Sequence, residues 1–307
     1  MVRHTGQNQH LLLPEVMKEL HRRGVRSQPV WDVESRPKHR LWTLGLPTAI
    51  VSLLPIRRFL PGWATIWQQV GYDKIREYAV LEHAGVPVPN WRPLYQNQVP
   101  DLSGFGEYVV VKPARGAYGA FVRVMRRDRV RWQPWKIERL GAADGPMVVQ
   151  EYVHTGPWPT CYRVSTIFGE PIYALRTVAD RTRKPIKHDG GYPRVFEGRT
   201  IVAGSKRCTM DTQVPEDVIE FARRTHAAFL TVPLLGVDIV REQGTGKLYV
   251  LEVNSNGGTF HLTSDTGRQV EREFGLDLCA QFGGAKAVAR GIHRRLAQAQ
   301  GNESLWI

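Results

Sequence analysis

The segment YVLEVNSNGG, residues 249–258, places a glutamate and an asparagine two residues apart in an otherwise apolar run. Because alternate side chains of a strand share a face, Glu252 and Asn254 should point to the same side. Leu251 and Val253 should point to the other side, which we expect to be the core. Oxygen donors paired on one face suit a hard cation such as Mg²⁺. An edge strand with one solvated face explains the same pattern without a metal.

The preceding run, LGVDIVRE, supplies a second strand, and the QGTG that follows it is typical of a turn. We therefore predict a hairpin in which Asp238 lies opposite or diagonal to Glu252. Val237 and Ile239 then join the buried side, and the other face gathers Asp238, Glu252 and Asn254. Two acids facing each other without a cation would repel, so the metal interpretation is favoured over the solvated strand.

A second group of residues suits a phosphate. Lys112 ends an apolar strand and is followed by PARGAYGAF, in which Gly116 and Gly119 allow a tight turn and a close approach of backbone N–H groups. Lys112 would add a point charge. The segment is neither a P-loop nor a dinucleotide-binding fingerprint, because GxxxxGK[ST] is absent and the loop joins strand to strand. An ordinary glycine turn in a hairpin is the alternative.

Composition limits the classes of protein that fit. The chain has 307 residues, 42% of them hydrophobic, which is enough for a sizeable core and two or three lobes. The formal charge of +13 favours acidic partners, although the basic run 123–131 reads as a solvated hairpin face. The three cysteines show no metal or disulfide spacing. No signal peptide or apolar span is evident, so we expect a soluble cytoplasmic protein that does not bind membranes.

The hydrophobic pattern indicates a mixed α+β protein, since strands and helices alternate irregularly and several strands form hairpins. Buried strands are expected around 107–125, 144–154 and 161–179, the last with a turn at Gly169. Helices are expected at 14–24, 73–85, 214–230 and over most of 277–298.

The order of these features resembles the ATP-grasp family, specifically the ribosomal-protein glutamate ligases and their glutathione-synthetase-like relatives. The resemblance rests on DKIREYAVLEHAGVPVPNW, YVVVKPARGAYGAFVRVM, VVQEYV, YRVSTIFGEPIYALRTVA and GVDIVREQGTGKLYVLEVNSNGG, from about residue 72 to 260. It implies an α+β fold in which two lobes grip ATP. We expect a short α/β N-terminal lobe over 1–70, a small ATP-grasp lobe over 71–155 and a large lobe over 156–300.

The resemblance assigns a role to each matching residue. Residues that would bind the nucleotide are Lys112, Arg115, Gly116, Ala117, Tyr118, Gly119, Glu151, Tyr152, Val153 and, as a second lysine, Lys74. Lys112 would touch the phosphates, the loop to Ala120 would cover them, and the QEYV segment would hold adenine. Magnesium ligands would be Asp238, Glu252 and Asn254, and the arginines facing the γ-phosphate or acyl phosphate would be Arg163 and Arg176.

Each of these residues also has a plainer explanation. Lys74 reads more simply as a solvated helix residue, Arg163 and Arg176 as partners of surface acids, Glu151 as a solvent-facing strand residue, and His261 as a packed or exposed loop histidine. The sequence departs from the family pattern twice. Cys161 stands where the ligases carry an acid, and Asn256 belongs to an NSNGG without the usual proline. Both departures lie near the acceptor side.

The resemblance implies an ATP-dependent carboxylate–amine or carboxylate–thiol ligase that acts through an acyl phosphate. ATP and Mg²⁺, two ions with Mn²⁺ as a substitute, are the expected cofactors, and a small-molecule or peptide carboxylate and an amine are the expected substrates. A homo-oligomer is consistent with the family. Phosphotransfer to another acceptor and a non-catalytic ATP-binding regulator are the alternatives. A nucleic-acid binder is disfavoured, because no nucleic-acid motif accompanies the positive charge.

Overall fold

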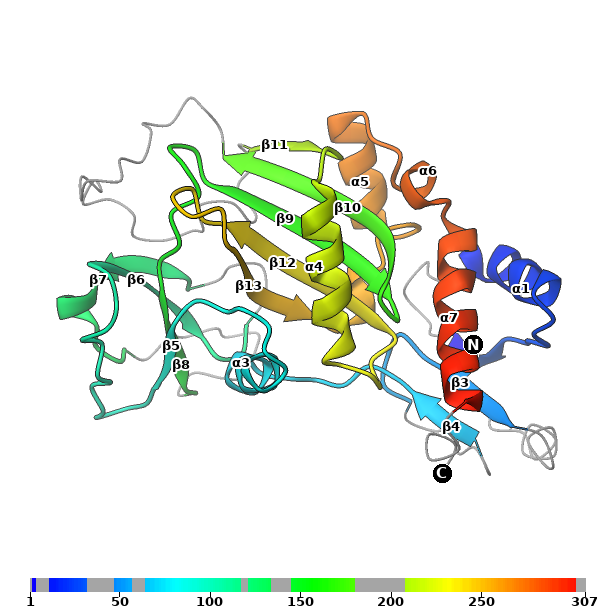
Figure 1. Cartoon of the computed structure of the whole chain (residues 1–307), viewed down its shortest axis with the longest axis horizontal. Coiled ribbons are helices and arrows are strands. Elements are labelled where there is room, and N and C mark those ends of the chain that lie inside the picture. The colour runs from blue at the N-terminus through cyan, green and yellow to red at the C-terminus, as the bar shows by residue number, and fades with distance from the viewer. Residues whose placement is uncertain are drawn as a thin grey trace.

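The computed structural model describes residues 2–3, 11–31, 47–56, 64–116, 121–133, 145–179 and 208–301 (Figure 1). Its helices are α1 (Leu13–Arg22), α3 (Lys74–His83), α4 (Glu216–Ala227), α5 (Asp265–Phe274), α6 (Leu278–Phe282) and α7 (Ala285–Gln300). The mixture of helices with mainly antiparallel sheets confirms the expected α+β class. Among the described residues, no helix is long and apolar enough to cross a membrane.

A smaller sheet lies at one end of the molecule, on the left of Figure 1. Its strands are β5 (Trp91–Leu94), β6 (Tyr108–Pro113), β7 (Arg123–Arg126) and β8 (Met147–Glu151), in the antiparallel order β5-β8-β6-β7. The glycine-containing segment joins β6 to β7, so the predicted strand–loop–strand arrangement is confirmed. Arg126, Arg127 and Arg129 are exposed at the end of β7, as expected for a solvated basic run.

A larger sheet forms the centre of the molecule. It consists of β9 (Thr160–Ile167), β10 (Glu170–Ala179), β11 (Cys208–Asp211), β12 (Leu234–Arg241) and β13 (Leu248–Asn254), in the antiparallel order β11-β10-β9-β12-β13. The turn between β9 and β10 contains Phe168 and Gly169, both with positive φ (47° and 80°). Glycine tolerates that conformation readily, which explains why the tight turn falls where the sequence predicts it.

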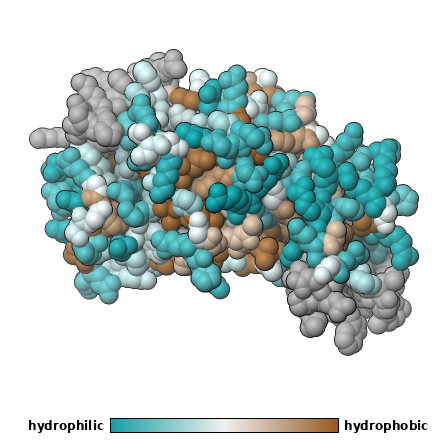
Figure 2. Space-filling model, viewed as in Figure 1, coloured by the Kyte–Doolittle hydropathy of each residue, from teal (hydrophilic) through white to brown (hydrophobic). Residues whose placement is uncertain are grey.

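The N-terminal region contains short parallel pairs. Strand β1 (Val2–Arg3) pairs with β2 (Val30–Trp31), and β3 (Thr48–Val51) pairs with β4 (Ala64–Trp67). Helix α1 packs beside α7 near this region, on the right of Figure 1. This side of the molecule is largely hydrophilic in Figure 2, whereas a hydrophobic area lies near the centre of the same face.

Two hydrophobic clusters cover opposite faces of the large sheet. On one face, α4 packs through Val218, Phe221 and Ala222 against strand residues that include Val164 and Val237. On the other face, the residues from 260 onward and α7 cover side chains that include Tyr173 and Leu175. The sheet therefore has a core on both sides.

The predicted helices form with slightly shorter bounds, and the tail is divided. Helix α3 begins after Asp73, whose side chain accepts a hydrogen bond from the Arg76 N–H (3.0 Å), as the cap pattern predicts. The tail forms α6 and α7 because Gly283 and Gly284 have positive φ and end the first helix. The sequence interpretation did not include helix α5, or the strands β1, β4 and β11.

Candidate active site

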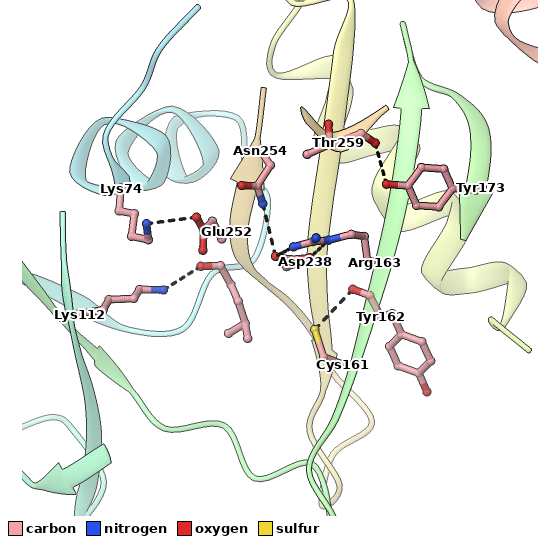
Figure 3. A network of polar contacts seen from close by, with 11 residues as sticks. Lys74, Lys112, Cys161, Tyr162, Arg163, Tyr173, Asp238, Glu252, Asn254 and Thr259 are labelled. Atoms are coloured by element: carbon pink, nitrogen blue, oxygen red, sulfur yellow. Dashed lines mark hydrogen bonds and ion pairs between the residues drawn. The ribbon is translucent and has the colours of Figure 1, made fainter. Parts of the chain in front are cut away.

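The β12–β13 hairpin brings together the acids that the sequence singles out. Asp238 lies directly opposite Glu252 in the register, which confirms the predicted pairing. Val237 and Val253 are buried on the other face, as expected. Asn254 shares the face of the acids, and its Nδ2 lies 3.4 Å from Asp238 Oδ2 (Figure 3). The two carboxylates and the amide therefore form one polar group at the junction of the two sheets.

The register shifts by one residue inside this hairpin. Asp238 pairs with Glu252, whereas Ile239 pairs with Val250, so Leu251 is an extra residue in β13. The expectation that Leu251 is buried beside Val253 is therefore wrong: Val250 takes the buried position, and Leu251 is only partly buried. The irregular backbone instead presents the Leu251 carbonyl to the smaller lobe.

Lys112 reaches across from the smaller sheet to that carbonyl. Its Nζ donates to Leu251 O at 3.0 Å, and the hydroxyl of Tyr78 on α3 donates to the same oxygen at 2.5 Å. Burial lowers the pKa of Lys112 to about 8; the Glu252 carboxylate opposes this shift, and the charge of Lys74 adds to it. A buried lysine whose ammonium meets a neutral carbonyl and the Tyr78 ring is well placed to bind an incoming anion.

Lys74 is part of the same group. The prediction that it is a solvated helix residue is wrong, because its side chain is only 8% exposed and its Nζ lies 3.1 Å from Glu252 Oε1. The backbone explains the position: Lys74 is the first residue of α3, and its N–H donates to Ala114 O (2.9 Å), directly after the lysine-bearing strand β6. The helix N-terminus is thereby fixed beside the glycine loop.

Arg163 on β9 completes the group. Its Nε and Nη2 donate to Oδ1 and Oδ2 of Asp238 at 2.7 and 2.6 Å (Figure 3). The sequence interpretation allowed a surface acid as its partner, but the partner is the predicted metal ligand itself. The Asp238 charge raises the pKa of Arg163 further above its usual range. Protein cations thus balance both acids: Arg163 balances Asp238, and Lys74 balances Glu252.

Glu77 also belongs to this group, although the sequence interpretation did not assign it a role. It is 7% exposed, and its Oε2 is buried without a hydrogen-bond partner. Burial, reinforced by Glu252, raises its pKa to about 8, while Lys74 and Lys112 act against that shift. A signal was present in the sequence: residues three and four positions after Lys74, which are Glu77 and Tyr78, lie on the same face of a helix.

The donor set fits a magnesium ion that is shared with a nucleotide. Asp238, Glu252 and Asn254 offer hard oxygen atoms on one face, which is the chemistry that Mg²⁺ prefers. Within the described ranges, no group of three or more His, Cys, Asp or Glu side chains could hold a metal ion alone. Mg²⁺ commonly uses one or two carboxylates together with substrate phosphates, so a two-acid site would need phosphate oxygens to complete its coordination.

The glycine loop is described only at its start. Arg115 is exposed, with its Nε 3.9 Å from Asp73 Oδ2, and Gly116 follows it. The predicted nucleotide-binding residues Ala117, Tyr118 and Gly119 lie outside the described residues.

The QEYV segment leaves the smaller sheet and leads to the larger one. Glu151 accepts hydrogen bonds from Asn90 Nδ2 (2.8 Å) and from the Gly106 N–H (3.1 Å), so its side chain is held locally rather than by solvent alone. Tyr152 and Val153 follow in the connection to β9 and are partly buried. Gln150, which the sequence interpretation passed over, is 1% exposed, and its Nε2 is buried without a partner.

Arg176 is separated from the other candidate residues. It pairs in register with Tyr162, whereas Arg163 pairs with Leu175, so the two arginines lie on opposite faces of the sheet. Arg176 instead forms an ion pair with Asp211 on β11, with Nη2 2.6 Å from Oδ2. The strand pairing does not bring the two predicted catalytic arginines together, and the plainer interpretation describes the position of Arg176.

Two further positions lie on the face that carries Arg163. His261 is 9% exposed and stacks on Tyr173 with a centroid distance of 5.4 Å, which confirms a packed histidine. Burial, followed by the charge of Arg163, lowers its pKa to about 4, and Asp238 opposes the shift. Cys161, two residues before Arg163, is partly buried, and burial raises the pKa of its thiol.

The profile of a protein family described as ATP-grasp domain matches residues 72–259, which is more than half of the sequence. The chain belongs to the ATP-grasp family. This finding confirms the family that the motifs suggested, and it agrees with the two sheets described above.

The similar solved structures are consistent with that family. The ATP-grasp ligase PsnB, complexed with a phosphomimetic variant of its minimal precursor, Mg and ADP, is 17% identical, with 94% of this chain and 97% of that chain covered and a TM-score of 0.53. PsnB with minimal precursor is 18% identical over the same shares, with a TM-score of 0.50. D-alanine–D-alanine ligase from Bacillus anthracis is 13% identical, covers 98% and 97%, and has a TM-score of 0.47. No curated protein sequence matches this chain.

Proposed function

We propose that this protein is an ATP- and Mg²⁺-dependent ligase that joins a carboxylate to an amine, or to a thiol, through an acyl phosphate. The observation that carries the proposal is the convergence of Lys74, Lys112, Arg163, Asp238 and Glu252 where the two sheets meet. These residues come from α3, β6, β9, β12 and β13, and nothing in a purely structural core requires so many charged side chains at one point.

The positions of the three cations support a division of roles. Lys112, which donates to a backbone carbonyl and lies over the Tyr78 ring, can turn to a phosphate with the loss of one neutral hydrogen bond. Lys74, which pairs with Glu252, would contact the same phosphates. Arg163 would lie toward the acceptor side, where its planar guanidinium suits the oxygens of a transferring phosphoryl group. Asp238, Glu252 and Asn254 would hold the magnesium ions, whose charge offsets that of the phosphates.

The proposed reaction has two steps. A carboxylate oxygen of the substrate attacks the γ-phosphorus, the bond from that phosphorus to the β,γ-bridging oxygen breaks, and ADP leaves. The amine then attacks the acyl carbon, the carbon–oxygen bond to the phosphate breaks, and the amine loses a proton. The chain need supply only positive charge and orientation, because no side-chain nucleophile takes part.

The substrates are proposed as a class. PsnB is described in complex with a precursor peptide, and the present chain carries a formal charge of +13. Both facts favour a carboxylate on an acidic peptide as the first substrate class to test, with a small-molecule carboxylate as the second. The departures at Cys161 and Asn256 are on the acceptor side, so the acceptor is expected to differ from those of the relatives that carry an acid and a proline there.

The test is calorimetry of ATP binding with and without Mg²⁺, on the wild type and on Glu252→Gln. We expect Mg²⁺-dependent binding that the substitution weakens by about tenfold or more, the factor for about 1.4 kcal/mol. Phosphate release that requires both a carboxylate and an amine would then distinguish a ligase from a phosphotransferase. Wild-type protein that binds no nucleotide would contradict the proposal.

A further inference from the structure

Arg295 is a buried arginine that has no acidic partner among the described residues, and it lies outside the group of residues described above. It is on α7 and is 5% exposed, and its Nε is buried without a hydrogen-bond partner. The neighbouring arginines of the same helix share one carboxylate. Arg290 Nε and Arg294 Nη2 contact the two carboxylate oxygens of Glu170, at 2.8 and 2.6 Å.

Within the part of the chain that the structure describes, the contact that balances the charge of Arg295 is aromatic. Its guanidinium carbon lies 5.2 Å from the centre of the Trp67 ring. Such a cation–π contact contributes at most about 2 kcal/mol when desolvated, and it satisfies none of the five N–H donors of the guanidinium. Burial lowers the pKa of Arg295, which is the expected sign for a cation that has lost water without gaining an anion. An unpaired buried charge is costly, so its retention points to a ligand.

The surroundings of Arg295 resemble a ligand site. Trp67 is the last residue of β4, and the Ser52 N–H, directly after β3, donates to its carbonyl at 2.9 Å. The carboxyl ends of parallel strands are where α/β folds commonly bind ligands. One end of α7 lies beside β3 and β4 in Figure 1. Phe168 meets the Trp67 ring edge-on at 5.2 Å and holds the indole in place.

The site is separate from the candidate active site. One turn before Arg295, Gly291 packs on the Ile167 carbonyl so closely that a Cβ there would lie 2.3 Å from the oxygen. Ile167 is four residues beyond Arg163 on β9, which corresponds to about 13 Å along the strand. A ligand at Arg295 therefore cannot share the contacts of Arg163 with Asp238.

We propose that Arg295 and Trp67 form a binding site for a carboxylate. The planar guanidinium can donate two parallel hydrogen bonds to the two oxygens of a carboxylate. The flat indole ring can pack against the planar pair that results. Arg295 supplies one positive charge, which a monoanion balances, and the side chains of Arg290 and Arg294 are held by Glu170. The proposal does not depend on the ligase activity proposed above.

The test uses sodium acetate as the probe and the full-length protein labelled with [¹⁵N]arginine. The Arg295 Nε–H resonance is assigned from its loss in Arg295→Met, or in Arg295→Lys where the methionine variant does not fold. We expect this resonance to shift saturably with acetate, and not with sodium chloride of equal ionic strength. Arg294→Met, one position earlier on the helix and half-exposed in the wild type, is the matched control and should keep the response.

Thermal unfolding provides an independent measurement. Acetate should raise the melting temperature of the wild type and of Arg294→Met above that in chloride, and Arg295→Met should lose this difference. An Arg295 resonance that does not move, or that moves equally with chloride, would show that Arg295 only clamps α7 onto Trp67. A stronger response to sodium phosphate than to acetate would overturn the carboxylate assignment.

Discussion

Arg163 and Asp238 form a two-point ion pair across adjacent antiparallel strands, with both donor–acceptor distances below 2.8 Å. The pair lies where a nucleotide-bound metal is proposed to lie, and the Asp238 side chain is only 15% exposed. The guanidinium of Arg163 therefore neutralises the Asp238 carboxylate, which is the group that is proposed to bind a metal ion. A metal ion that binds Asp238, as proposed, must compete with Arg163.

This competition predicts that Arg163→Gln increases the response of the protein to magnesium. The substitution leaves a partly buried carboxylate without a cation, which should lower the free energy of unfolding by about 2 kcal/mol or more. Mg²⁺ should restore part of that loss, so the melting temperature of the variant should rise more steeply with Mg²⁺ than that of the wild type. Differential scanning calorimetry over a magnesium series measures this difference. The control is Arg163→Gln combined with Asp238→Asn, which should respond less; equal responses of the single and double variants would contradict competition.

A second prediction concerns the charge of Lys112. Because burial lowers its pKa to about 8, the lysine is charged below that pH and neutral above it. If Lys112 binds phosphate, ATP affinity should fall as the pH rises through about 8, although bound ATP will itself raise the pKa. Lys112→Met should bind ATP at least about tenfold more weakly at pH 7, and its affinity should lose that pH dependence.

Lys112→Arg provides the control, because a guanidinium keeps its charge throughout this pH range. Calorimetric titrations at pH 7, 8 and 9 compare the three proteins. An unchanged ATP affinity in Lys112→Met would remove this residue from the phosphate site.

A third prediction separates the two arginines that the resemblance treats alike. Arg176 lies on the opposite face of the sheet from Arg163 and pairs with Asp211, and about a third of each side chain is exposed. Arg176→Gln should therefore leave Mg²⁺-dependent ATP binding within about twofold of the wild type and change stability by about 0.5–1 kcal/mol. Arg163→Gln, measured in parallel, should change ATP binding. If Arg176→Gln and Arg163→Gln lose ATP binding equally, the conclusion that Arg176 lies outside the nucleotide site is wrong.

The sequence predicts much of this site because its signals are local. The alternation in β13 places Glu252 and Asn254 on one face, and the QGTG turn places Asp238 opposite Glu252. What it does not predict depends on contacts between distant segments. No local sequence pattern indicates that Leu251 is an extra residue in β13, yet its carbonyl accepts the hydrogen bond from Lys112. Whether a lysine at the start of a helix is solvated depends on which strand the helix packs against. This is why the interpretation of Lys74 as a solvated residue is wrong.

The face on which Arg176 lies is difficult to predict for a different reason. Arg163 and Arg176 are on strands joined by a tight turn, and the register of such a hairpin decides which residues share a face. The shift in pairing between Pro171 and Tyr173 moves that register by one residue. No pattern in the chain announces this irregularity, and counting residues from the turn is not sufficient to place the second arginine.

The last prediction concerns His226, whose burial makes folding depend on pH. It is 3% exposed; its Nε2 lies 2.8 Å from the Val232 carbonyl, and its Nδ1 lies 2.6 Å from Thr166 Oγ1. Burial lowers its pKa to about 4, from 6.5, and the bond to Val232 acts against that shift. The unfolded chain therefore binds a proton between about pH 6.5 and 4 that the folded protein does not. Stability from this group is complete above pH 6.5 and falls as the pH falls toward 4.

The loss should approach about 1.4 kcal/mol for each pH unit in that window. His226→Gln should be less stable than the wild type at pH 7, because it loses packing and hydrogen bonds, but its stability should fall less steeply toward pH 5. Urea unfolding at pH 5, 6 and 7 measures both slopes. His21→Gln is the control, because it replaces an exposed histidine of α1 and leaves the buried histidines in place. It should keep the wild-type slope. If His226→Gln keeps that slope as well, protonation of His226 does not limit folding, and the buried His261, whose pKa is also lowered to about 4, is the residue to substitute next.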